Sequence, residues 1–136
     1  MEIKKKTEDI EVNGKKYRLQ KMDARTGSYL AAKLAVFALP LMNKEQKLNA
    51  EDFGKLLSVM DFKEFVELQN TVLRTVLKIV ETSTGDEMPE LLLDKANIIT
   101  DEDLAYDTAS LIQLTVRALI FNIGSFFGEK GLGVMK

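Results

Sequence analysis

The dipeptide Asn13-Gly14 is the feature that most constrains how this sequence can fold. A type I′ turn requires positive φ at both of its central residues, and Asn followed by Gly meets this requirement best. Apolar and polar residues alternate on both sides of the dipeptide, in the segment IEVNGKKYRL at positions 10–19. The sequence therefore predicts a β-hairpin over residues 8–20.

Two patterns agree on the register of this hairpin. When the strands pair around the Asn-Gly turn, the apolar side chains share one face: Ile10, Val12, Tyr17 and Leu19. The other face then carries two cross-strand pairs of opposite charge: Glu11 with Lys16, and Asp9 with Arg18. Because an isolated two-stranded hairpin is marginal in water, we expect the apolar face to pack on the rest of the chain.

Two helices are predicted after the hairpin. The first covers residues 24–39, because Asp23 can act as its N-cap and Pro40 cannot continue it. Its apolar stripe has helical spacing: Leu30, Leu34, Phe37 and Leu41. A second, short helix follows Asn49, which resembles an N-cap, and its apolar face consists of four residues: Phe53, Leu56, Leu57 and Met60.

The longest amphipathic pattern covers residues 62–83. Asp61 with Glu64 gives the signature of a capping box at its start. We predict one continuous helix here, with an apolar side made of seven residues: Phe62, Phe65, Val66, Leu73, Val76, Leu77 and Val80. Residues 84–100 include a Gly and a Pro and show no sustained period, so we predict a connection there.

The last predicted helix covers residues 101–126, with Thr100 and Asp103 as its capping signal. It is apolar nearly all round, and its narrow polar strip contains five residues: Asp107, Ser110, Gln113, Arg117 and Gly124. A helix of this kind lies at the centre of a bundle or is partly buried by another molecule.

These elements predict a mainly α protein: a small helical bundle of about four helices with the N-terminal β-hairpin packed on it. A length of 136 residues suits one domain. We expect this helical domain to span residues 1–128, with the hairpin at 8–20. A flexible, Gly-rich C-terminal tail is expected at residues 129–136.

The composition leaves few residues for catalysis or metal binding. The sequence contains no Cys and no His, which removes disulfides, thiol nucleophiles and most zinc sites. One acidic group suggests a Mg²⁺ site: Asp101, Glu102, Asp103 and Asp107. Consecutive residues at a helix start point in different directions, so we interpret this group as a charged first turn. We therefore predict no enzyme activity, no catalytic or metal-binding residues and no cofactor.

The sequence predicts neither a secretory signal nor a membrane span. The start, MEIKKKTEDI, lacks the apolar stretch of a signal peptide. The most apolar windows are too short or too interrupted to cross a bilayer. We therefore expect a cytoplasmic protein that does not bind to a membrane.

A basic N-terminal arm raises the alternative of nucleic-acid binding. Seven cations could follow a phosphate backbone: Lys4, Lys5, Lys6, Lys15, Lys16, Arg18 and Lys21. The net charge of the whole chain is −2, however, and a nucleic-acid-binding domain usually carries a basic excess. The only aromatic residue of the arm, Tyr17, is predicted to face the core. We therefore favour a partner other than nucleic acid.

Apolar residues are concentrated towards the end of the chain, beyond what one amphipathic stripe needs. Exposed apolar residues often mark a binding surface. The candidate partner-binding residues are Phe121, Phe126, Phe127, Leu132, Val134 and Met135.

The order of these elements resembles the tail assembly chaperones of long-tailed bacteriophages and prophages, over about residues 8–128. Three segments carry the resemblance: the hairpin VNGKKYRLQKM, the helix start ARTG at Ala24–Gly27, and the pattern N-x-x-x-F-F at Asn122–Phe127. None of the three is diagnostic alone.

The resemblance implies a non-enzymatic protein that binds the tape-measure protein, keeps it soluble and helps recruit tail-tube subunits. Such a protein would act in the cytoplasm of the bacterial host and would be absent from the mature virion. Two alternatives stay open. One is a self-associating structural or head–tail adaptor protein, which would form a homo-oligomer, and the other is a small nucleic-acid-binding regulator.

Overall fold

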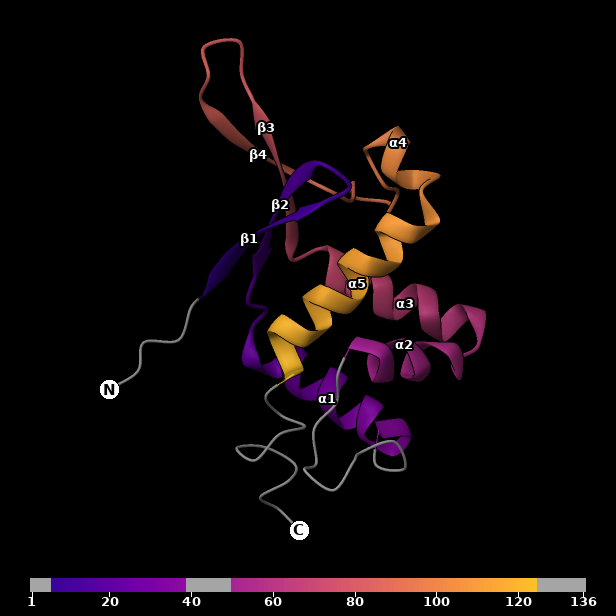
Figure 1. Ribbon diagram of the computed structural model, residues 1–136. Helices are drawn as coiled ribbons and strands as arrows, with labels where there is room; N and C mark the ends of the chain where they lie inside the picture. The colour runs from indigo at the N-terminus through magenta and orange to yellow at the C-terminus, as the bar shows by residue number, and fades with distance from the viewer. Residues whose placement is uncertain (1–5, 39–49, 125–136) are drawn as a thin grey trace, which may run out of the picture.

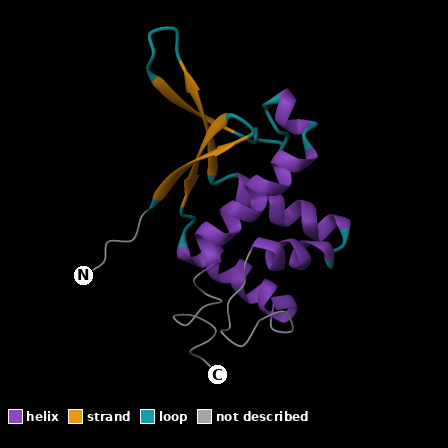
Figure 2. Ribbon diagram, in the orientation of Figure 1, coloured by secondary structure: helices purple, strands orange, loops and turns teal. Residues whose placement is uncertain are grey.

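The computed structural model describes residues 6–38 and 50–124 (Figure 1). The elements follow in this order: β1 (Thr7–Val12), β2 (Lys15–Gln20), α1 (Ala24–Ala38), α2 (Ala50–Ser58), α3 (Phe62–Leu73), β3 (Val76–Glu81), β4 (Glu87–Leu91), α4 (Glu102–Ala105) and α5 (Thr108–Ile123). The helices lie together on one side, and the strands lie beside them (Figure 2).

The predicted N-terminal hairpin is confirmed. Asn13 and Gly14 have φ of 50° and 77°, as a type I′ turn requires. The register pairs Ile10 with Tyr17 and Glu8 with Leu19. All four residues of the predicted apolar face are buried: Ile10, Val12, Tyr17 and Leu19. The hairpin is therefore part of the core.

Only one of the two predicted charge pairs forms an ion pair across the hairpin. Arg18 Nε lies 2.7 Å from Asp9 Oδ1. Lys16 is opposite Glu11 in the register, but its ammonium lies 3.1 Å from Glu87 Oε1 on β4. Lys16 pairs with Glu87 because β4, a strand that was not predicted from the sequence, brings Glu87 within its reach.

The prediction of a mainly α bundle with only a hairpin is wrong. The strands form one four-stranded antiparallel sheet in the order β1-β2-β3-β4. Residues 76–81 were predicted to continue the long helix, but they form β3, and 87–91, predicted as a connection, form β4. The helix ends because Val76 pairs with Leu19 of β2 and takes a place in the sheet. Val, Ile and Leu in this segment suit a strand buried between two neighbours.

The predicted apolar side of the long helix is confirmed only in part: Leu73 and Val76 are buried, whereas other members are not. Phe62 is 83% exposed, because it is the first residue of α3 and follows the N-cap Asp61. The buried side of α3 consists of Leu68, Val72 and Leu73. The predicted cap itself is confirmed, since Asp61 Oδ1 accepts a hydrogen bond of 2.8 Å from Glu64 N.

The predicted last helix is divided into α4 and α5. Asp101 caps α4 and Asp107 caps α5, each by accepting bonds from backbone N–H groups of the following turn. Thr100, predicted as the cap, instead donates its hydroxyl to the carbonyl of Leu91 at 2.9 Å. Asp107 therefore caps a new helix, α5. The axis of α5 runs in a different direction from that of α4 (Figure 1).

The first helix follows the prediction closely. Asp23 accepts a bond of 3.0 Å from Thr26 N and one of 2.7 Å from the Thr26 hydroxyl. Leu30 and Leu34 are buried as predicted. Leu41 and the predicted cap Asn49 lie outside the described residues.

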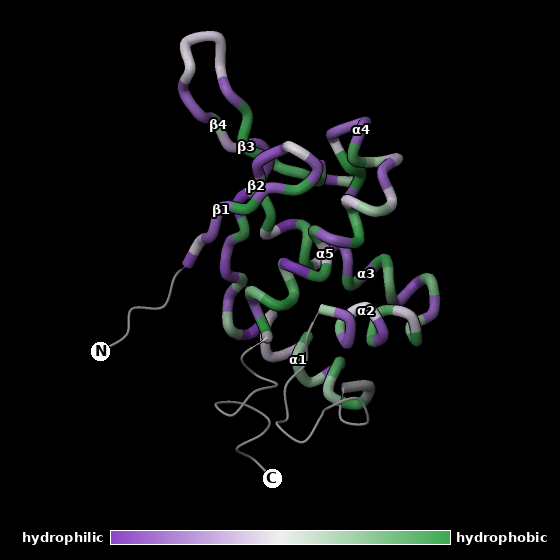
Figure 3. The backbone as a smooth tube through the Cα atoms, viewed as in Figure 1, coloured by the Kyte–Doolittle hydropathy of each residue, from purple (hydrophilic) through white to green (hydrophobic). Residues whose placement is uncertain are grey.

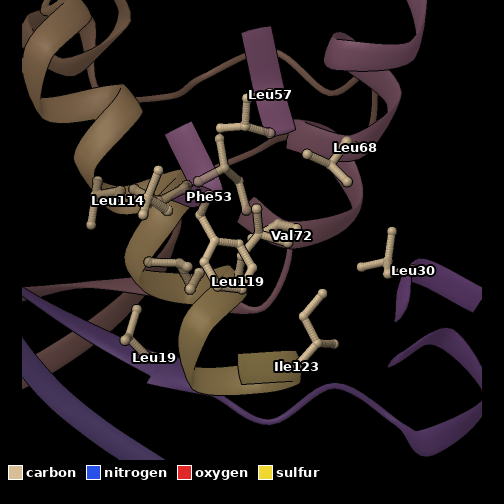
Figure 4. Packing of buried hydrophobic residues seen from close by; sticks show 14 of the residues in the cluster. Leu19, Leu30, Phe53, Leu57, Leu68, Val72, Leu114, Leu119 and Ile123 are labelled. Carbon is tan, nitrogen blue, oxygen red and sulfur yellow. The ribbon is translucent and has the colours of Figure 1, made fainter. Parts of the chain in front are cut away.

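Helix α5 packs at the centre of the core, against α1, α2, α3 and the first two strands. Figure 4 shows Phe53 of α2 directed towards Leu119 of α5 and Val72 of α3. All three side chains are fully buried. The hairpin of β3 and β4 extends away from this core, and every residue of β4 is exposed (Figure 1).

Candidate protein-binding groove

One face of α5 is only partly covered by the core: Ala109 and Ile112 are exposed and Ile120 is half-buried, whereas Val116 is buried. Residues Ala109, Ile112, Val116 and Ile120 are spaced by three or four positions, so they follow one stripe of the helix. Ile112 is 39% exposed, whereas Leu114 on the opposite side of the helix is fully buried. Figure 3 shows how hydrophobic residues recur along α5. This stripe forms the floor of an open apolar groove.

The groove has a volume of about 720 Å³ and lies between the first two strands and α2. Glu8 and Leu19 line it from the strands. Ala50, Glu51 and Gly54 line it from α2, and a methyl group added at Gly54 would meet no atom within 4 Å. The small residues of α2 leave the α5 stripe accessible, so the groove is open along the helix.

Three charged residues line the groove: Glu8, Glu51 and Arg117. Arg117 Nη1 donates to the carbonyl of Glu11 at 3.4 Å, which ties the α5 side chain to β1. The two glutamates are exposed and lie on opposite sides of the α5 stripe. The floor is therefore apolar, and each side carries a carboxylate.

Phe121 is the predicted partner-binding residue that the structure places at this groove. Its ring is half-buried, and Lys21 Nζ lies 4.2 Å from the ring centroid. The Lys21 ammonium also donates to the Phe121 carbonyl. The other predicted residues lie outside the described residues: Phe126, Phe127, Leu132, Val134 and Met135.

Asn122 fixes the end of α5 that carries Phe121. Its side-chain oxygen accepts a bond of 2.7 Å from Met22 N, and its amide nitrogen donates to the carbonyls of Gln20 at 3.3 Å and Ala118 at 3.0 Å. One side chain thus joins α5 to the connection between β2 and α1. This network holds the strand side of the groove against the helix.

The predicted polar strip of the last helix is corrected at Ser110. This residue is buried, and its hydroxyl donates to Asp107 Oδ2 at 2.6 Å. Gln113 and Arg117 do line the groove. Sequence reasoning missed the α2 side, although Ala50 and Gly54 are one turn apart and share a face.

Two residues of the acidic group at 101–107, Asp101 and Asp103, form ion pairs with lysines from the sheet. Asp101 Oδ2 lies 2.8 Å from Lys78 Nζ and 3.5 Å from Lys15 Nζ, and its side chain is 8% exposed. The hydrogen bond from Lys78 is the main reason why the pKa of Asp101 is below its usual value. Within the described residues, no group of three or more acidic side chains is placed to hold a metal ion.

The cations of the hairpin are paired in the same manner. Lys15 reaches Asp101 and Asp103, Lys16 reaches Glu87, and Arg18 reaches Asp9. These three side chains therefore do not present an unpaired basic surface. Lys4 and Lys5 lie outside the described residues.

Open apolar grooves along a helix are typical of domains that accept a segment of another protein. A family model described as phage tail assembly chaperone protein, TAC, matches residues 13–133. The chain belongs to the phage tail assembly chaperone family. Searches of curated proteins and of solved structures found no match. Among the helices of residues 6–38 and 50–124, none has the length and apolar character to cross a membrane.

Proposed function

We propose that this protein binds an amphipathic helix of the phage tape-measure protein in the α5 groove, keeps that protein soluble, and helps recruit tail-tube subunits. It acts in the cytoplasm of the bacterial host, makes or breaks no covalent bond, and leaves before the virion is mature. The observation that carries this proposal is the open apolar groove along α5, between the strands and α2, with Ile112 exposed on its floor.

The dimensions of the groove suit a helix. From Ala109 to Ile120 the floor extends for about 16 Å, since a helix rises about 1.5 Å per residue. A bound helix of about three turns would place residues i, i+3 or i+4, and i+7 on this floor, which is the usual helix-in-groove spacing. Such a contact hides the apolar stripe of the client from other clients, so it opposes aggregation.

Co-expression with the tape-measure protein of the same phage tests this proposal. We expect the tape-measure protein to be soluble and to co-purify with the wild-type chain. Gly54→Leu should abolish co-purification, because the new side chain enters the groove where no atom lies within 4 Å of the Cβ. Gly54→Ala adds only a methyl group and should retain it.

Ser58→Leu provides the matched control for the added apolar side chain. Ser58 is an exposed residue of α2 that does not line the groove. This variant should bind like the wild type. Equal co-purification of Gly54→Leu and the wild type would place the binding surface elsewhere and contradict the proposal.

The alternative of a self-associating structural or head–tail adaptor protein uses the same exposed stripe for a second copy. Light scattering over a concentration series separates the two functions. A closed ring of fixed mass, with no gain in tape-measure solubility, favours the adaptor. A chain that stays free to bind the tape-measure protein favours the chaperone.

A further inference from the structure

We infer that the client helix of the α5 groove carries basic residues on both flanks of its apolar stripe. This inference rests on the proposed function and specifies the chemistry of the partner. The observation that carries it is the placement of Glu8 on β1 and Glu51 on α2, on opposite sides of an apolar floor.

Neither glutamate is strongly neutralised by another residue of the described ranges 6–38 and 50–124. Among the described residues, Glu8 has no ion-pair partner. Glu51 has only Lys55, at 3.8 Å, and both side chains are largely exposed. An exposed pair of this kind contributes little, so the carboxylate of Glu51 is available to a ligand.

Arg117 does not cancel the two carboxylates. Its guanidinium is held towards β1 by the carbonyl of Glu11, and it lies on the floor-forming helix and not on the α2 side. Lys21 contacts Phe121 but does not line the groove. The charged groups that line the groove therefore sum to a net negative charge.

A helix that lies in the groove directs the residues beside its apolar stripe towards the two sides, as flanking positions do in helix pairs. Lys or Arg at these positions would meet Glu8 and Glu51. Complementary charge of this kind raises the association rate and selects partners more than it raises affinity. Like charges at the same positions would repel.

Three synthetic helical peptides with one apolar stripe and Lys, Gln or Glu at the flanking positions test this inference. Binding to the full chain is measured by fluorescence anisotropy. We expect the Lys peptide to bind about tenfold more tightly than the Glu peptide at low salt, since each exposed pair is worth about two- to fivefold. The difference should shrink as salt is added.

The double variant Glu8→Lys/Glu51→Lys should reverse the order of the three peptides. The matched control is Glu67→Lys/Glu81→Lys, which changes the net charge equally at exposed residues that do not line the groove. The control should keep the Lys peptide tightest. An unchanged order in the groove variant, or equal binding of all three peptides, would overturn the inference.

Other occupants of the groove give distinct results. A monomer–dimer equilibrium that is lost in Gly54→Leu would assign the groove to a second copy and overturn the inference. Deletion of residues 125–136 could also make all three peptides bind more tightly and to the same extent. That result would assign the groove to residues 125–136 and would overturn the inference.

Failure of the inference differs from failure of the proposed function. If all three peptides bind equally and Gly54→Leu blocks each of them, the groove binds helices but does not select by charge. If the tape-measure protein does not co-purify at all, the proposed function fails, whichever peptide binds.

Discussion

Lys78 of β3 and Asp101, the N-cap of α4, form an ion pair of 2.8 Å that joins the sheet to the start of the C-terminal helices. The Asp101 side chain is 8% exposed and that of Lys78 is 27% exposed. A pair this sheltered is worth more than an exposed surface pair, because removal of one partner leaves the other poorly solvated.

Asp101→Asn tests this pair without removing the cap, because Asn is an equally good N-cap residue. We expect a loss of about 1.5–3 kcal/mol in the free energy of unfolding, the usual range for a hydrogen bond to a charged group. Urea denaturation at pH 7 measures it. Asp103→Asn is the control, since the Asp103 side chain is 88% exposed and its removal should cost far less.

The same pair predicts a pH dependence. The pKa of Asp101 is lowered in the folded protein, chiefly by the hydrogen bond from Lys78, from a usual value of 3.8. A lowered pKa contributes stability that is complete above the unfolded value and is lost as the pH falls through the folded value. The stability gap between the wild type and Asp101→Asn should therefore be constant above about pH 5 and narrow in more acidic solution. A gap that stays constant into strong acid would show that charge is not its cause.

Tyr17→Ala tests whether the N-terminal hairpin is part of the core. Tyr17 is 1% exposed and lies within the main hydrophobic cluster. We expect a loss of about 3–4 kcal/mol in the free energy of unfolding, as for other large buried side chains. Lys16→Ala should cost far less, because its pair with Glu87 is exposed. Chemical denaturation of both variants provides the comparison, and the reverse order would make the hairpin a surface arm.

Two Gly→Ala substitutions should change stability in opposite directions. Gly14 has φ of 77°, which Ala adopts only with strain, so Gly14→Ala should destabilise the protein by about 1 kcal/mol or more. Gly54 lies within α2, and an added methyl group there meets open space, so Gly54→Ala should stabilise by about 0.5–1 kcal/mol. Thermal unfolding measures both. Destabilisation by Gly54→Ala would mean that the α2 side of the groove is filled.

Asn122→Ala should destabilise the protein by about 1–3 kcal/mol, because it leaves the part-buried Met22 N–H without its acceptor. Asn122→Asp keeps this acceptor but loses the donor to Gln20 and Ala118. It should therefore retain part of the stability at neutral pH. Equal losses in the two variants would show that the Met22 bond is not the one that matters.

Local signals explain which parts of the fold could be predicted. The register and the buried face of the hairpin were predicted because the turn residues and the alternation all lie within a few residues of Asn13. The caps at Asp23 and Asp61 are equally local. Each of these features is stabilised by contacts close in sequence, so one sequence suffices to find them.

Strand β3 could not be found in this way. Val76, Leu77 and Val80 continue the helical period of α3 by chance, and no Gly or Pro separates the two elements. What makes this segment a strand is the pairing of Val76 with Leu19 and of Leu77 with Arg18, which are far away in the sequence. The restart at Asp107 was missed for a similar reason, because Asp107 also fits the polar strip of a continuous helix.

The candidate groove was predicted only in part. The surplus of apolar residues on the last helix indicated a binding surface, and Phe121 does line the groove. Its two sides come from β1 and from α2, whose positions next to α5 depend on the whole fold. A single sequence does not reveal such a juxtaposition.

Site-specific photocrosslinking tests the central claim most directly. A photoreactive residue in place of Ile112, which is 39% exposed on the groove floor, is compared with one in place of Phe62, which is 83% exposed and does not line the groove. With the tape-measure protein co-expressed, we predict a crosslinked product from position 112 and none from position 62. Crosslinking from position 62 alone, or equally from both, would contradict binding in the α5 groove.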